Sequence, residues 1–182
     1  MSVIFPANTQ EAGPPSTIAA RRERRQASFA ESFAQIVAVF MRDRNFRTLT
    51  IAELEWLVLP PIMVGQFALA HAPTGRSSAK GEKVKAQQNG AAHVPVAVAL
   101  WARVSPSIDR ALSENLDKAI KLQAADWSSG DRLWLLALAG DQRVFPRFLA
   151  QLGEKDFQGR QVKMRKRTPE GKVVIQTIGQ PS

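Results

Sequence analysis

The sequence predicts an α+β fold, an α/β layer arrangement in which helices cover a mostly antiparallel sheet. Apolar residues with helical spacing alternate with short apolar runs that are bounded by turn residues, and two pairs of these runs are placed to form hairpins. The chain has 182 residues, of which 45% are hydrophobic, so it can bury one sizeable core. We therefore expect a single globular domain over residues 28–180.

Residues 1–27 are expected to form a disordered basic arm. The segment contains three prolines, scattered polar residues and the charged run Arg21-Arg22-Glu23-Arg24-Arg25. It has too little apolar surface to offset the entropy that ordering would cost. The arginines suit phosphate binding, but a solvated charge run is the simpler interpretation.

Two helices are predicted next, and each begins at a capping box. These boxes are Ser28 with Glu31, and Thr50 with Glu53. In the first helix, apolar residues recur at helical spacing to about Arg42. The second helix is shorter and is expected to end at the proline pair 60–61. A polar connection over residues 43–47 joins the two helices.

Two strands are expected over residues 66–70 and 95–104. The residues between them, about 72–93, are mostly Gly, Ser, Lys, Gln, Asn and Ala without periodicity. This composition predicts a flexible hairpin loop. Ser105-Pro106 then starts a short helix that reaches about Asn115.

The run from Asp126 to Leu136 is the most informative stretch of the second half. A tryptophan, a small polar turn and an Asp-Arg pair lead into the apolar residues 133–138. This pattern predicts a tight loop that feeds a buried strand, although a buried helical segment fits the periodicity as well. We expect Asp126 and Asp131 to accept backbone N–H bonds around the turn.

A helix and a hairpin are predicted after this run. Apolar spacing indicates a helix over about 143–152 that Gly153 stops, and residues 161–168 and 173–178 flank a turn. On the first strand of the hairpin, basic side chains on one face alternate with apolar ones on the other. They form a basic stripe of Lys163, Arg165 and Arg167.

Composition excludes several kinds of site. The chain has no cysteine, and its two imidazoles, His71 and His93, are on no ligand-spaced motif, so we expect no metal site. No stretch has the uninterrupted apolar length of a membrane span, and the first residues lack a secretory pattern, so we expect a cytoplasmic protein. The net charge of +9 favours acidic partners.

Four blocks occur in a distinctive order. They are residues 36–41, residues 59–67, residues 95–102, and Asp126-Trp127-Ser128-Ser129-Gly130-Asp131 with Trp134. Together they resemble the RTX toxin-activating lysine acyltransferases of the hemolysin C type. The resemblance covers roughly residues 33–178, and the last block is quite specific.

This resemblance implies a fold similar to the GNAT acetyltransferases, usually as a homodimer. It also implies an enzyme that takes a fatty acyl group from acyl-carrier protein, rather than from coenzyme A. Such enzymes transfer the group to internal lysine side chains of an RTX-type toxin before export. Acyl-carrier protein would then be the donor and no cofactor would be permanently bound. The basic surface of this chain suits that strongly acidic donor.

The chain departs from the family at both catalytic positions. The family's catalytic histidine lies in a Ser-Pro-x-His-Arg pattern, and counting back from the Leu-Pro block places Phe46 there. The family's catalytic aspartate follows the tryptophan of the last block by three positions, where this chain has Ala137. Asp131, Asp141 and His71 are weak candidates for a substitute base.

Other site residues are assigned through the resemblance. Substrate-binding candidates are Trp101, Trp127, Arg132 and Trp134. The two strand residues among them, Trp101 and Trp134, are more often core residues than ligand contacts. The basic stripe of Lys163, Arg165 and Arg167 is the candidate contact for acyl-carrier protein.

Two alternatives stay open. The first is a non-catalytic relative that binds acyl-carrier protein or an RTX partner, and it is motivated by Phe46 and Ala137. The second is a nucleic-acid binding module, suggested by the arginine run and the basic hairpin. The chain carries no nucleic-acid recognition motif, so the second alternative has weaker support.

Overall fold

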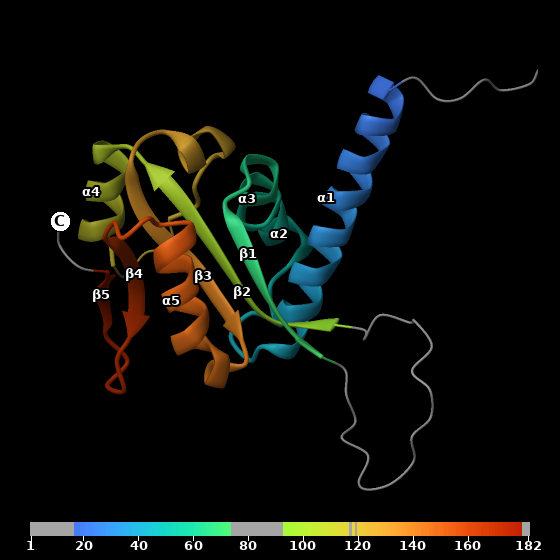
Figure 1. Cartoon of the computed structure of the whole chain (residues 1–182). Coiled ribbons are helices and arrows are strands. Elements are labelled where there is room, and N and C mark those ends of the chain that lie inside the picture. The colour runs from blue at the N-terminus through green and yellow to red at the C-terminus, as the bar shows by residue number, and fades with distance from the viewer. Residues whose placement is uncertain (1–16, 74–92, 117, 119, 180–182) are drawn as a thin grey trace, which may run out of the picture.

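The structure is a computed structural model that describes residues 17–73, 93–116, 118 and 120–179. Its centre is a five-stranded sheet with the order β1-β2-β3-β4-β5 (Figure 1). The strands are β1 (Phe67–Pro73), β2 (His93–Val104), β3 (Arg132–Gly140), β4 (Val162–Arg167) and β5 (Val173–Ile178). Neighbouring strands are antiparallel except β3 and β4, which are parallel. The predicted fold class is confirmed.

Helices cover both faces of this sheet. Before the sheet come α1 (Thr17–Arg42), α2 (Ile51–Leu57) and α3 (Leu59–Val64), and within the rest of the chain lie α4 (Pro106–Glu114), η1 (Ala124–Ser128), η2 (Gln142–Val144) and α5 (Phe145–Lys155). Alternate residues of β2 point to opposite faces, as in any strand. Val98 and Leu100 belong to the core on the α1 side, whereas Ala99 and Trp101 belong to the core on the α5 side.

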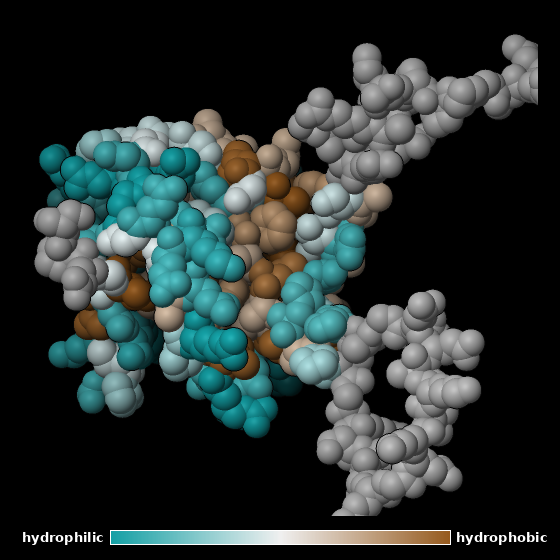
Figure 2. Space-filling view, viewed as in Figure 1, coloured by the Kyte–Doolittle hydropathy of each residue, from teal (hydrophilic) through white to brown (hydrophobic). Residues whose placement is uncertain are grey.

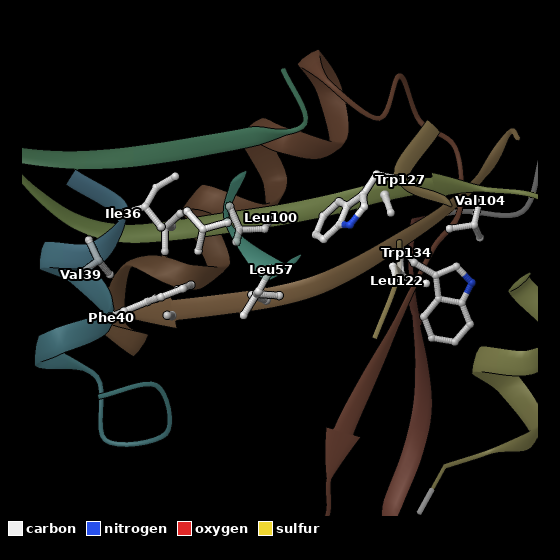
Figure 3. Close-up of a cluster of buried hydrophobic side chains, with 14 of the residues drawn as sticks. Ile36, Val39, Phe40, Leu57, Leu100, Val104, Leu122, Trp127 and Trp134 are labelled. Carbon is white, nitrogen blue, oxygen red and sulfur yellow. The ribbon is translucent and has the colours of Figure 1, made fainter. Parts of the chain in front are cut away.

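The core on the α1 side is the larger of the two. Figure 3 shows α1 side chains beside Leu100 of β2, with Leu57 of α2 nearby and both Trp127 and Trp134 farther along the sheet. The core on the α5 side gathers Trp101, Phe148, Leu152 and Phe157. There Trp101 and Phe157 pack edge to face, with ring centroids 5.4 Å apart. Each sheet face therefore has its own apolar layer.

The predicted start of the first helix is wrong. Helix α1 begins at Thr17 rather than Ser28, so the part of the expected arm over 17–27 is helical, and residues 1–16 lie outside the described residues. The segment before Ser28 is rich in Ala, Arg, Glu and Gln, which are strong helix formers. Extending an existing helix needs no new nucleus, so these residues join α1.

Two helix ends also differ from their predictions. Helix α2 ends at Leu57, before the proline pair, and the prolines lie instead in the first turn of α3, where a backbone N–H would have no intrahelical acceptor. Helix α5 continues past Gly153 to Lys155. A glycine in this position only weakens a helix, and the buried contacts of Leu152 and Phe157 hold the last turn.

The remaining elements follow the predictions closely. The Thr50–Glu53 capping box forms, Ser105 caps α4, and the last two strands form the expected hairpin around Gly171, whose φ is +84°. Of the expected loop at about 72–93, residues 74–92 lie outside the described residues. Figure 2 shows apolar surface gathered over the region of β1 and α3, where Met63 is 76% exposed.

Candidate active site

The sheet opens between β3 and β4. Only Leu133, Trp134 and Leu135 of β3 pair with β4, although β3 continues to Gly140. The pairing of β3 with β2 shifts by one residue here, because Trp101 pairs with Leu135 but Leu100 pairs with Ala137. Leu136 is therefore a β-bulge, a feature that bends strands and is common next to active sites.

A groove of about 810 Å³ lies beside this opening, between α5 and the β4–β5 hairpin. Its size falls in the range of roughly 300–1,000 Å³ that is typical of small-molecule sites. The walls are mostly apolar, with three polar side chains among them. The lining residues are Leu138, Gln142, Phe145, Pro146, Leu149, Ala150, Gly153, Met164, Lys166, Gln176, Ile178 and Gly179.

Phe46 and Ala137, the two positions that the resemblance assigns to a catalytic histidine and aspartate, belong to one apolar cluster. Phe46 stacks on Phe40 of α1, with ring centroids 4.7 Å apart and an interplanar angle of 16°. Ala137 is 3% exposed and belongs to the same core, against which Phe46 packs. Because Leu138 follows Ala137 on the strand, this cluster and the groove lie on opposite faces of β3.

Asp43 anchors the connection that carries Phe46. One carboxylate oxygen accepts the backbone N–H of Asn45 at 2.8 Å, and the other accepts the backbone N–H of Gly140 at 2.8 Å. The connection between α1 and α2 is thereby tied to the end of β3. Sequence reasoning noted this polar connection but did not identify Asp43, since its partner is 97 residues away.

The tryptophan block, residues 126–131, joins β1, β2 and α4. Trp127 is fully buried, Ser128 Oγ accepts a hydrogen bond from the Gln66 amide at 3.0 Å, and Ser129 Oγ accepts the backbone N–H of Ser105 at 2.9 Å. Asp126 accepts the backbone N–H of Gln123 at 2.8 Å, which confirms its predicted structural role. The same prediction is wrong for Asp131, whose exposed carboxylate lies 3.9 Å from Arg132 Nε. These contacts make the block a packing element of the domain.

The four substrate-binding candidates differ in exposure. Trp127 and Trp134 are fully buried and Trp101 is 4% exposed, so their rings pack in the two cores. The core interpretation of Trp101 and Trp134 is confirmed. Of the four, only Arg132 has an exposed side chain, with an exposed fraction of 54%.

A polar network lies under the opening of the sheet. Asp109 of α4 accepts the Trp134 indole N–H and the Lys163 ammonium, both at 2.7 Å, and Arg132 lies 3.7 Å from its other oxygen. Burial raises the pKa of the Asp109 carboxyl, but the hydrogen bonds from Lys163 and Trp134 outweigh it, so the pKa is lowered overall. The sequence offered no signal for Asp109, which lies among the apolar positions of a predicted helix.

The basic stripe of the hairpin is largely engaged within the protein. Lys163 pairs with Asp109, and the Arg165 guanidinium donates to the backbone oxygens of Leu112 in the last turn of α4 and of Asn115 and Lys118 beyond it. Arg167 donates to Gly171 O at 3.1 Å. The cation on the groove side of β4 is instead Lys166.

The three candidate substitutes for the base are not brought together. Asp131 and Asp141 lie at opposite ends of β3, and His71 is on β1, where it contacts Gln35 at 3.1 Å. Hydrogen bonds from Arg143 lower the pKa of Asp141 to about 2. At neutral pH this carboxylate is therefore a poor proton acceptor.

The described residues contain neither a cluster of metal ligands nor a helix that could span a membrane. Over 17–73, 93–116 and 120–179, no three His, Asp or Glu side chains converge as metal ligands. Within the same part of the chain, no helix is both long and apolar enough to cross a bilayer.

Comparison with known proteins gives one family. The family model described as the RTX toxin acyltransferase family matches residues 85–178, about half of the chain. The matched range contains the tryptophan block and Ala137, and it includes the strands that form the opening. No curated protein matches the chain.

Proposed function

Because the chain belongs to the RTX toxin acyltransferase family, we propose that it moves a fatty acyl group from acyl-carrier protein to internal lysine side chains of an RTX-type protein. The observation that carries this proposal is the opening between β3 and β4 beside an apolar groove. Leu138 borders the groove, and beyond Leu135 no described residue of β4 pairs with β3. The strand can thus present unpaired backbone groups to a bound thioester carbonyl.

The proposed reaction is a transfer from sulfur to nitrogen. A neutral lysine amine attacks the thioester carbonyl, the new C–N bond forms, and the C–S bond breaks. The electron pair leaves with the thiol of the carrier, and the amine proton passes to a base or to water. The protein then contributes mainly by holding donor and acceptor together, which can supply several kcal/mol.

The absence of a histidine and an aspartate at positions 46 and 137 has a calculable effect on the rate of acyl transfer. A lysine with a pKa near 10.4 must lose a proton, which costs about 4–5 kcal/mol at pH 7. A positioned general base typically contributes about a hundred- to ten-thousand-fold in rate, or roughly 3–5.5 kcal/mol of barrier. With Phe46 and Ala137 at the two family positions, we expect transfer to be slow and to accelerate at alkaline pH as the acceptor amine deprotonates.

The direct test uses acyl-carrier protein that bears a labelled acyl chain, together with an RTX-type acceptor. We expect label on acceptor lysines, slow transfer at pH 7 and faster transfer at pH 9. An Ala150→Arg variant, which places a charged side chain in the groove, should lower the rate at least tenfold. The matched control is Gln151→Arg, whose side chain is exposed on the same helix but does not line the groove. No label on lysine with the unaltered protein would refute the proposal.

A second candidate function is a non-catalytic relative that binds acyl-carrier protein or an RTX partner. It is favoured by the stacking of Phe46 on Phe40 and by the burial of Ala137, which give both family positions a packing role. Phe46→His combined with Ala137→Asp tests it. If the scaffold is otherwise competent, the double variant should gain acylation of about a hundredfold or more. A high rate in the unaltered protein that the double variant leaves unchanged would remove this candidate.

The mixed sheet with one parallel pair supports the proposed likeness to the GNAT acetyltransferases. Contact of the carrier with Lys163, Arg165 and Arg167 stays a prediction, and Lys166 is a further candidate because it borders the groove. The homodimer and the cytoplasmic location also stay predictions of the family resemblance.

A further inference from the structure

Two of the three polar side chains of the groove lie at one end, and the third, Gln176, lies on β5 opposite Met164. Gln142 and Lys166 lie toward the ends of β3 and β4 where the sheet opens, and Phe145 begins α5 there. Helix α5 runs back along the strands, so Gly153 lies toward the opposite end, near Ile178, the partner of Val162 at the start of β4. A ligand with a polar head and an apolar tail would fit this order of side chains.

The apolar stretch has the length of an alkyl chain. From Phe145 to Gly153, α5 rises about 12 Å at ~1.5 Å per residue. A C–C bond of ~1.5 Å advances an extended alkyl chain by about 1.3 Å, so a chain along this stretch has on the order of ten carbons. Leu149, Met164 and Ile178 supply the apolar contacts along the way.

Gly153 leaves the far end of the groove open. A Cβ built at Gly153 would meet no atom within 4 Å, so the backbone here is not crowded. Its helical position asks for no positive φ, and a glycine inside a helix costs roughly 0.5–1 kcal/mol relative to alanine. The absence of a side chain therefore widens the groove, although the backbone conformation at this position does not require a glycine.

We propose that this groove binds the aliphatic chain of the acyl group and that Gly153 determines the longest chain it accepts. The inference rests on the proposed function for the identity of the ligand as an acyl group. The head of the ligand would lie between Lys166 and the opening of the sheet, and the tail would run along α5 to Gly153. A side chain at position 153 would fill the place of the last carbons.

Binding can be measured without any transfer step. A fluorescent fatty acid is bound to the protein, and a series of saturated fatty acids of increasing length displaces it. For Gly153→Leu we expect at least a tenfold loss of affinity for the longest acids with little change for the shortest, and for Gly153→Ala a smaller shift in the same direction. Gln151→Leu adds the same side chain to an exposed position of α5 outside the groove, and it should behave as the unaltered protein.

Two results would overturn the inference. The first is that the unaltered protein binds no fatty acid. The second is that Gly153→Leu has the same affinities for short and long fatty acids as the unaltered protein. If the leucine variant does not fold, Gly153→Ala takes its place in this comparison. If length-dependent binding is found but no label reaches lysine in the transfer assay, the groove assignment stands and the proposed function fails.

Discussion

Asp109 shows how one buried carboxylate can connect three elements. It belongs to α4, and it accepts hydrogen bonds from Trp134 of β3 and Lys163 of β4. Lys163 Nζ also lies 5.7 Å from the centroid of the Trp134 ring, within the distance of a cation–π contact. The carboxylate therefore holds the two parallel strands just below the point where they part.

Replacing Asp109 by asparagine should lower the free energy of unfolding at pH 7 by about 1.5–3 kcal/mol, the usual contribution of a hydrogen bond to a charged group. The Lys163 ammonium would lose its counter-charge while remaining partly buried. Denaturant titration measures the effect. Asp131→Asn is the control, because the Asp131 side chain is 85% exposed and its loss should change stability by less than about 0.5 kcal/mol.

The same variant carries a pH signature. The pKa of Asp109 is lowered in the folded protein, so the unfolded chain takes up the proton first as the pH falls. The stabilisation is thus fully present above the ordinary aspartate pKa of about 3.9 and is lost below it. The difference in unfolding free energy between the unaltered protein and Asp109→Asn should shrink as the pH falls below about 4. A difference that stays constant down to pH 2, or is absent at pH 7, would contradict this role.

At the scale of elements, the tryptophan block connects the first two strands and α4 through hydrogen bonds and packing. Its glycine has a specific steric role. Gly130 N donates to Arg103 O at 3.0 Å, and a Cβ at this position would clash with Val104 O and lie 2.7 Å from Ser105 Cα. Both contacts are with backbone atoms, so no side-chain rotation can relieve them.

Gly130→Ala should therefore destabilise the domain by about 1–3 kcal/mol or more, as overpacking against a fixed backbone does. For a chain of this size the thermal midpoint should fall by about 2–4 °C for each kcal/mol. Gly153→Ala is the matched control, since its Cβ meets no atom, and it should raise stability slightly. Equal thermal midpoints for the two variants would show that the block does not pack as described.

At the scale of the whole molecule, the sheet separates the larger core from the groove. Its α1 face holds the larger core, which includes Ala137 and packs against Phe46. Its α5 face holds the groove. In the proposed transfer, the hydrocarbon chain in the groove is therefore on the face of the sheet opposite to Phe46 and Ala137.

Sequence reasoning located most elements because their signals are local. The Thr50–Glu53 box, the Ser105 cap and the turn at Gly171 involve residues three or four positions apart. The start of α1 was missed because a run of good helix formers has no marked boundary. The groove was missed for another reason: its walls come from β3, α5 and the last hairpin, and their apolar residues look like ordinary core residues in the sequence.

By itself, the sequence determined the fold class, the order of strands and helices, and the family, because alternation, capping and motif spacing are properties of neighbouring residues. Through the family resemblance it also predicted that Phe46 and Ala137 stand at the positions of a catalytic histidine and aspartate. Only the tertiary structure decided that these two positions share one core, that Asp109 accepts from Trp134 and Lys163, and that the sheet opens after Leu135. The physical reason is that these contacts join residues 25 or more positions apart, and strand register and helix packing bring them together.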